Sequence, residues 1–92
     1  MKLKGKIAVV TGGTGVLGSN VSQGLLEAGA TVIVVGSRQE TVDKALAKLS
    51  PVAAANDTTV TGFACNMLDH SAITELTEKV KNQFKRVDIL VN

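Results

Sequence analysis

Short apolar runs alternate along the chain with longer stretches in which apolar residues recur every three or four positions. The short runs predict buried strands, and the longer stretches predict amphipathic helices between them. The predicted strands cover Ile7–Val10, Thr31–Val35, Val60–Cys65 and Val87–Val91.

The first predicted helix covers Val16 to Ala28, followed by Gly29 at the place where helices commonly end in glycine. Its polar face would carry Asn20, Gln23 and Glu27. Its inward face would carry Leu17, Val21, Leu25 and Ala28.

The second predicted helix begins at Ser37, because Ser37 and Glu40 have the spacing of a capping box. We expect Pro51 to end it and residues 52–57 to form a loop. Its inner side would carry Val42, Ala45, Leu46 and Leu49.

The third predicted helix is capped by Asp69 or Ser71. Its apolar stripe consists of Ile73, Leu76, Val80 and Phe84.

Strands joined by helical crossovers run parallel, and the crossovers are right-handed. The order βαβαβαβ therefore predicts part of a doubly wound α/β sheet of the Rossmann type, with spatial strand order 3-2-1-4. We expect residues 1–92 to belong to one domain, and the length allows no more than one.

A glycine-rich segment, Thr11 to Gly18, follows the first predicted strand and opens the first helix. Gly12 would allow the tight turn, Gly15 would let a pyrophosphate approach the backbone, and Gly18 would let the helix pack closely on the sheet. The helix N-terminus offers N–H groups and a positive dipole end to phosphates. The expected cofactor contacts in this segment are Gly12, Thr14, Gly15, Val16, Leu17 and Gly18.

Composition excludes several other classes of function. A net charge of +2 and only two aromatic residues argue against nucleic-acid binding. One cysteine and one histidine are too few for a usual zinc site, and no apolar run is long enough to span a membrane. The single cysteine also fits a reducing compartment, so we expect a cytoplasmic protein.

The sequence resembles the short-chain dehydrogenase/reductase family along its whole length. The resemblance rests on three segments: Thr11 to Gly18, Ala64 to Asp69, and Asp88 to Asn92. It implies an oxidoreductase that moves a hydride between a nicotinamide dinucleotide and a carbonyl or alcohol substrate, and a full-length parent that is a homo-oligomer. It also implies that Asn66 and Met67 line an adenine pocket, that Asn92 contacts the cofactor, and that Asp88 tethers neighbouring backbone.

Two residues depart from the family's usual pattern. Val16 stands where the standard branch has glycine, and this spacing matches the extended branch that includes sugar-nucleotide epimerases. Asn66 stands where an aspartate is usual, so it brings hydrogen-bonding capacity without charge.

The end of the second strand bears on the choice of cofactor. An acid that reads a ribose 2′-hydroxyl should lie about 20 residues past the glycine loop, but here Ser37 and Arg38 follow Gly36. Arg38 can pair with a 2′-phosphate, which favours NADP, with NAD use possible. Alternatively, Ser37 only caps the helix and Arg38 is solvated.

The family's Tyr-x-x-x-Lys pair has no counterpart, because the sequence contains no tyrosine. We therefore expect no catalytic residue within these 92 residues and interpret the sequence as a truncated part of an enzyme. Two alternatives stay open: a stand-alone dinucleotide-binding module, and part of an extended-branch epimerase or dehydratase.

Other polar residues have ordinary structural interpretations. Cys65 is expected to be a buried core thiol, His70 an exposed side chain, and Asp69 a helix cap. The basic residues Lys79, Lys81, Lys85 and Arg86 are expected to form a solvated face at the end of a helix.

Overall fold

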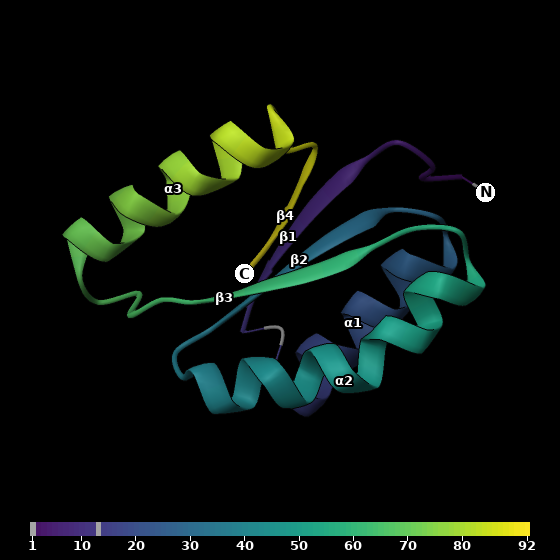
Figure 1. The fold of residues 1–92 in the computed structure, drawn as a ribbon, viewed down its shortest axis with the longest axis horizontal. Helices are drawn as coiled ribbons and strands as arrows, with labels where there is room; N and C mark the ends of the chain where they lie inside the picture. The colour runs from purple at the N-terminus through teal and green to yellow at the C-terminus, as the bar shows by residue number, and fades with distance from the viewer. Residues whose placement is uncertain (1, 13) are drawn as a thin grey trace.

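The four predicted strands form one parallel sheet in the computed structural model, which describes residues 2–12 and 14–92 (Figure 1). Their order across the sheet is β3-β2-β1-β4, which confirms the predicted doubly wound topology. In register, Ala8 of β1 lies opposite Val32 of β2 and Ile89 of β4, and Val32 lies opposite Val60 of β3. The strands are β1 (Ile7–Thr11), β2 (Thr31–Gly36), β3 (Val60–Ala64) and β4 (Ile89–Val91).

Helices cover both faces of this sheet. Helices α1 (Val16–Glu27) and α2 (Gln39–Ala55) lie on one face, and α3 (His70–Phe84) lies on the other (Figure 1). The chain steps from β1 to β2 to β3 in one direction and then crosses back to β4 in the opposite direction. Because each crossover is right-handed, this reversal places α3 on the face opposite α1 and α2.

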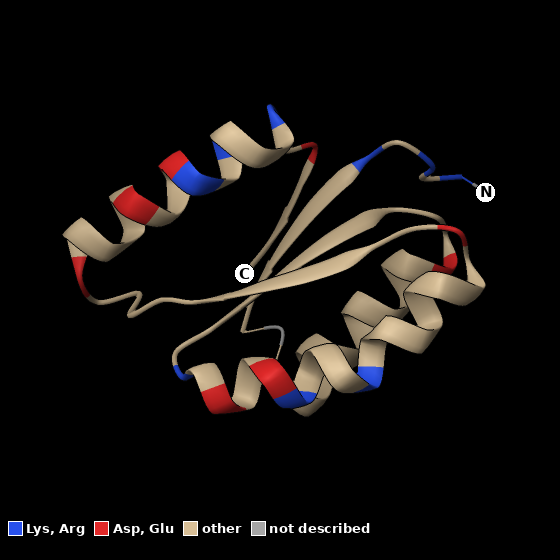
Figure 2. Ribbon diagram, viewed as in Figure 1, with Lys and Arg blue, Asp and Glu red and all other residues tan. Residues whose placement is uncertain are grey.

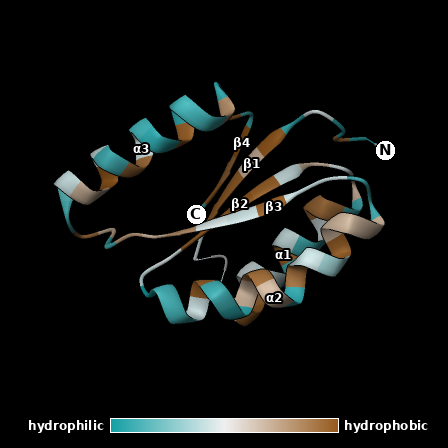
Figure 3. Cartoon of the chain, in the orientation of Figure 1, coloured by the Kyte–Doolittle hydropathy of each residue, from teal (hydrophilic) through white to brown (hydrophobic). Residues whose placement is uncertain are grey.

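The core follows the two-residue period of the central strands. Ala8 and Val10 of β1 face the α1–α2 side, whereas Val9 faces α3. The same alternation runs through β2, whose Ile33 is fully buried beneath α3. Charged residues lie on helices and turns, while the strands carry none (Figure 2). The apolar colouring of β1, β2 and β4 and of the inward helix faces shows the same division, whereas β3 is paler (Figure 3).

Helix α1 presents a different face to the core from the one predicted. Leu17 was expected to point inward, but it is 77% exposed, and the fully buried side chains include Ser22 and Leu26. The buried residues of α1 are Ser19, Ser22 and Leu26, so its buried face is turned away from Leu17 and carries small side chains in the first half of the helix. Gly29, with φ +94°, follows the end of this helix as predicted.

The predicted start of α2 is wrong. The N-cap is Arg38, not Ser37, and no side chain caps this helix end, so the expected capping box does not form. The Thr41 hydroxyl instead donates to the Arg38 carbonyl at 2.9 Å. Ser37 therefore belongs to the turn between β2 and α2.

The predicted end of α2 is also wrong, because Pro51 lies inside the helix and residues 52–55 are helical. Proline removes one N–H donor, which leaves one carbonyl of the preceding turn without its helical partner. Pro51 is exposed, so that carbonyl can reach water. The buried side chain of Ala53 packs in the core cluster under α1 and α2. This burial stabilises the helical conformation of the residues after Pro51.

Asp69 caps α3 as predicted, accepting hydrogen bonds from the backbone N–H groups of Ser71 and Ala72. The predicted stripe of α3 faces the sheet, with Val80 buried and Ile73, Leu76 and Phe84 packed beside it.

Asp88 tethers the start of β4 to β1, as the resemblance implied. Its carboxylate accepts the Ile7 N–H at 2.9 Å, and its own N–H donates to the Ile7 carbonyl at 2.8 Å. Arg86 donates to the same carboxylate at 3.0 Å and to the Gly5 carbonyl at 2.8 Å. Arg86 is therefore part of this clasp and not simply solvated, as had been expected.

Within residues 2–12 and 14–92, no helix combines the length and the apolar character needed to cross a membrane.

Candidate functional site

The candidate residues all follow the carboxyl ends of strands. Because the four strands are parallel, these ends share one edge of the sheet, which is where ligands bind in open α/β folds. The glycine loop (Gly12 to Gly18) follows β1, Ser37 and Arg38 follow β2, Asn66 and Met67 follow β3, and Asn92 follows β4.

The glycine loop leaves β1 through a turn that requires glycine. Gly12 has φ +72°, a left-handed conformation that other residues adopt only with strain. Its N–H donates to the Val35 carbonyl at 2.8 Å, which anchors the start of the loop to β2. The Gly15 N–H donates to the Gly12 carbonyl at 3.3 Å, and Gly13 lies outside the described residues.

The N-terminus of α1 opens at this edge. Gly15 is the N-cap and has no side chain that could accept the N–H groups of the first helical turn. These groups also have no acceptor within the helix. Among the described residues, a Cβ on Gly15 would meet nothing closer than the Gly12 carbonyl oxygen, 3.8 Å away, so these residues leave the space over Gly15 open. An open backbone surface and the N–H groups at the positive end of a helix fit a phosphate group.

Exposed apolar side chains border that helix end. Val16 is 84% exposed and Leu17 is 77% exposed. Gly18 lies in the first turn of α1 and is half-buried.

Ser37 and Arg38, named here the Ser-Arg turn, lie beside the glycine loop. A close approach between Gly36 and Thr14 brings the two segments together: a Cβ built on Gly36 would lie 2.7 Å from the Thr14 Cγ2 atom. Both residues of the turn are exposed, and Arg38 forms no salt bridge with any residue that the structure describes. Its guanidinium is therefore available to an anion at this edge.

Asn66 uses half of its side chain in a local turn. Its Oδ1 accepts the Leu68 N–H at 3.0 Å, and its backbone carbonyl accepts the Asp69 N–H at 3.0 Å. The Nδ2 group remains available to donate to a ligand. The preceding residue, Cys65, donates its N–H to the Gly36 carbonyl, so the turn starts beside the end of β2.

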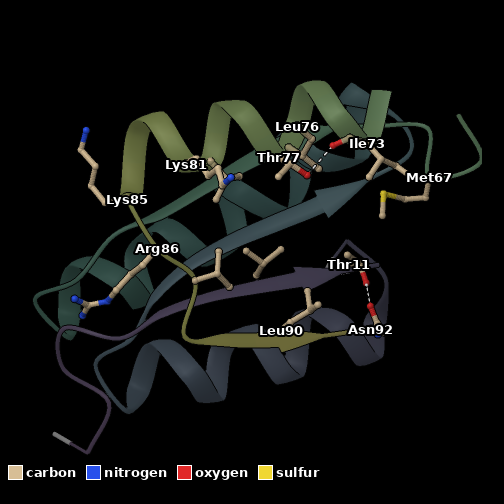
Figure 4. Close-up of a pocket in the computed structure, with 13 residues that line it drawn as sticks. Thr11, Met67, Ile73, Leu76, Thr77, Lys81, Lys85, Arg86, Leu90 and Asn92 are labelled. Atoms are coloured by element: carbon tan, nitrogen blue, oxygen red, sulfur yellow. Dashed lines mark hydrogen bonds between the residues drawn. The ribbon is translucent and has the colours of Figure 1, made fainter. Parts of the chain in front are cut away.

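Met67 and Asn92 are separate from the Ser-Arg turn and lie at the mouth of a pocket between α3 and the β1–β4 half of the sheet (Figure 4). The Thr11 hydroxyl lies within hydrogen-bond distance of the Val91 carbonyl, 3.1 Å, and of the Asn92 Oδ1, 3.3 Å. Thr11 thus joins the ends of β1 and β4. The pocket has a volume of about 450 Å³, and apolar side chains line it from two sides: Ile73, Leu76 and Val80 of α3, and Val9 and Leu90 of the sheet.

The residues that were expected to have only structural roles lie where those roles require. Cys65 is buried in the cluster beneath α3, and His70 is exposed at the start of that helix. Lys79, Lys81 and Lys85 are exposed, as predicted. Across the described residues, no group of three or more acidic, histidine or cysteine side chains is arranged to hold a metal ion.

Sequence reasoning did not identify two contacts of this edge. The Thr11 hydroxyl bridge was missed, although its position directly before the glycine loop could have drawn attention to it. The fit of Thr14 over Gly36 carried no signal in the sequence, because the two residues are brought together only when β1 and β2 pair.

The topology and the glycine loop define the class, a Rossmann-type α/β protein with a phosphate-compatible helix end. The sequence pattern of the family described as short chain dehydrogenase matches residues 6–92. The chain belongs to the short-chain dehydrogenase family.

Its relatives include a 3α-hydroxysteroid dehydrogenase of Mediterraneibacter gnavus, which is 44% identical over 92 residues. That match covers 100% of this chain and 36% of the relative, so the chain spans about a third of the length of that protein. A 3-oxoacyl-[acyl-carrier-protein] reductase of Aquifex aeolicus is 34% identical, again with 100% of this chain and 36% of the relative covered.

Among solved structures, the Pseudomonas aeruginosa RhlG/NADP active-site complex superposes with a TM-score of 0.88 at 31% identity. It is matched over 99% of this chain and 34% of that one.

Proposed function

We propose that this chain is the cofactor-binding part of an NADP(H)-dependent oxidoreductase, and that the cofactor's 2′-phosphate contacts the Ser-Arg turn. When bound, the nicotinamide would carry the hydride, which the reduced form gives to a carbonyl substrate of the whole protein and the oxidised form takes from an alcohol. Family membership supports this class of reaction, and the NADP in the complex of the RhlG relative supports the cofactor. A cytoplasmic location belongs to the same proposal.

The observation that carries the proposal is the juxtaposition of two anion-compatible groups at one edge. The glycine loop ends in the open, positive N-terminus of α1, and Thr14 of this loop touches Gly36, which directly precedes the Ser-Arg turn. One nucleotide could therefore place its pyrophosphate at the helix end and its adenosine ribose over β2.

Local charges favour a phosphorylated ribose over an unmodified one. No carboxylate occurs among residues 36–38, so no acidic side chain there would accept a hydrogen bond from a ribose hydroxyl or repel a phosphate. The acidic residue that follows, Glu40, has its carboxylate 3.9 Å from the Lys44 ammonium on the surface of α2. Arg38 is the cation that follows the end of β2 in the chain, and it has no salt-bridge partner among the described residues.

The first test compares two nucleotides that differ only in the 2′-phosphate. Calorimetric titration of the chain with 2′,5′-ADP and with 5′-AMP should give tighter binding of 2′,5′-ADP. Arg38→Leu should weaken 2′,5′-ADP binding by about ten- to a hundredfold, because a hydrogen bond to a charged group contributes about 1.5–3 kcal/mol. It should leave 5′-AMP binding unchanged.

Lys48→Leu is the matched control, since Lys48 is an exposed cation farther along the same helix that follows the turn. It removes one positive charge from α2, keeps the Glu40–Lys44 pair, and should leave the affinity ratio as it was. Equal affinities of the unsubstituted chain for the two nucleotides would refute the NADP assignment. So would an Arg38→Leu variant that behaves like Lys48→Leu.

A further inference from the structure

We propose that Gly36 is a positioning residue for the nucleotide, because its missing side chain lets Thr14 sit against the end of β2 and thereby sets the spacing between the glycine loop and the Ser-Arg turn. This inference rests on the proposed function, in which one nucleotide contacts both segments.

The contact leaves no room for a methyl group. A Cβ on Gly36 would lie 2.7 Å from Thr14 Cγ2, 3.0 Å from Thr14 Oγ1 and 3.1 Å from Val42 Cγ2. The first distance is shorter than carbon atoms tolerate, since non-bonded carbons prefer about 3.5–4.0 Å. Position 36 therefore accepts a side chain only if a neighbour moves.

Rotating Thr14 does not relieve the clash. Two of its three staggered positions border the site of the added Cβ, and threonine fills two of the three in every rotamer. At least one branch of the side chain therefore stays against the new methyl group. A serine has only one branch, so it can turn its hydroxyl to the position that does not border Gly36.

Pairing with β3 holds the end of β2 in place. The Gly36 carbonyl accepts the Cys65 N–H at 2.8 Å, and Gly36 pairs with Ala64 of β3. The loop is tied to β2 by the Gly12 N–H, which donates to the Val35 carbonyl. A methyl group at position 36 should consequently push the loop outward and strain that hydrogen bond.

Such a displacement matters because the ligand must be contacted from both sides. Hydrogen bonds weaken steeply once the donor and acceptor are more than a few tenths of an ångström from their preferred separation. A loop moved away from the Ser-Arg turn cannot bind the pyrophosphate while Arg38 binds the 2′-phosphate.

Gly62→Ala provides a matched structural control. A Cβ on Gly62 in β3 would lie 2.6 Å from Val42 Cγ1, so it disturbs the same α2 residue that Gly36→Ala approaches. Gly62 is remote from the glycine loop in the sheet order, because β2 lies between β3 and β1. Both substitutions should lower the melting temperature, but only Gly36→Ala should affect the site.

The experiment measures binding and local protection in four variants: Gly36→Ala, Gly62→Ala, Thr14→Ser, and Gly36→Ala combined with Thr14→Ser. Gly36→Ala should lose about tenfold in 2′,5′-ADP affinity, more than it loses for 5′-AMP. The double variant should bind 2′,5′-ADP as tightly as Thr14→Ser alone does. Amide hydrogen exchange followed by NMR, without nucleotide, should show faster exchange at Gly12 in Gly36→Ala and not in Gly62→Ala.

The two proposals fail differently. If the unsubstituted chain does not prefer 2′,5′-ADP, the NADP assignment is wrong, and the Gly12 exchange rates alone decide whether Gly36 sets the loop position. If the chain prefers 2′,5′-ADP but Gly36→Ala keeps both that preference and the Gly12 protection, Gly36 has no positioning role. If Gly36→Ala and Gly62→Ala lose equal affinity for 2′,5′-ADP, the loss comes from general destabilisation and Gly36 has no positioning role.

Discussion

At the scale of single residues, α1 carries an unusual polar core position. Ser22 is fully buried between α1 and the sheet, and its Oγ has no hydrogen-bond partner among the described residues. A buried hydroxyl without a partner loses its hydration and gains nothing in return. The small side chain still serves the packing, because α1 lies close to both the sheet and α2.

Ser22→Ala should therefore stabilise the chain. It removes the unsatisfied hydroxyl, keeps the Cβ and improves helix propensity, for a gain of about 1 kcal/mol. In a domain of this size that corresponds to a rise in melting temperature of roughly 4–8 °C. Ser50→Ala is the control, since the Ser50 hydroxyl is exposed and already donates to the Leu46 carbonyl at 2.6 Å. An unchanged or lower melting temperature in Ser22→Ala would mean that the Ser22 hydroxyl has a partner.

At the scale of elements, the clasp between β1 and β4 depends on ionised Asp88. The Ile7 N–H that its carboxylate accepts lowers the pKa of Asp88 below 3.8, and the hydrogen bond from Arg86 lowers that pKa further. Because the pKa in the folded chain lies below that in the unfolded chain, the clasp contributes its full stability above the unfolded value. This contribution is lost as the pH falls through the folded value.

Asp88→Asn should accordingly lower the melting temperature at neutral pH and flatten its decline below about pH 4. Melting curves recorded from pH 7 to pH 2 measure both effects. Glu78→Gln, which removes an exposed carboxylate of α3, should leave the curve unchanged. If Asp88→Asn and the unsubstituted chain lose stability in parallel as the pH falls, the clasp does not depend on this carboxylate.

At the scale of the whole molecule, one side of the sheet is thinly covered. Helix α3 and the β1–β4 half of the sheet enclose the half-open pocket of about 450 Å³ described above. Leu90 of β4, which lines the pocket, is 63% exposed, and β4 is an edge strand. An apolar patch beside an unpaired strand edge favours association.

We expect the chain to self-associate through this pocket. Leu90→Glu should weaken association by at least about tenfold, because burying a leucine contributes about 1.5–3 kcal/mol. Sedimentation velocity at several concentrations measures the change. Leu68→Glu is the control, since Leu68 is 97% exposed and lies outside the pocket lining. A chain that sediments as a monomer at all concentrations would contradict this expectation.

The sequence by itself determined the element types and their order in space. Apolar runs and amphipathic spacing are local patterns, and the right-handed crossover rule converts their order into the arrangement β3-β2-β1-β4. It also determined that the candidate residues after each strand gather at one edge, since parallel strands end together. The Asp69 cap could also be predicted from the sequence, because a helix cap involves only residues that are neighbours in the chain.

Tertiary structure alone decided features that depend on what packs against each residue. Pro51 remains helical because burial of Ala53 outweighs a lost backbone hydrogen bond, and helix propensity carries no information about that partner. Leu17 is exposed because α1 packs through a face that contains Ser19, Ser22 and Leu26, and the period of apolar residues cannot reveal that small polar side chains form part of the buried face. The fit of Thr14 against Gly36 exists only once β1 and β2 have paired, since it joins residues from two different strand ends.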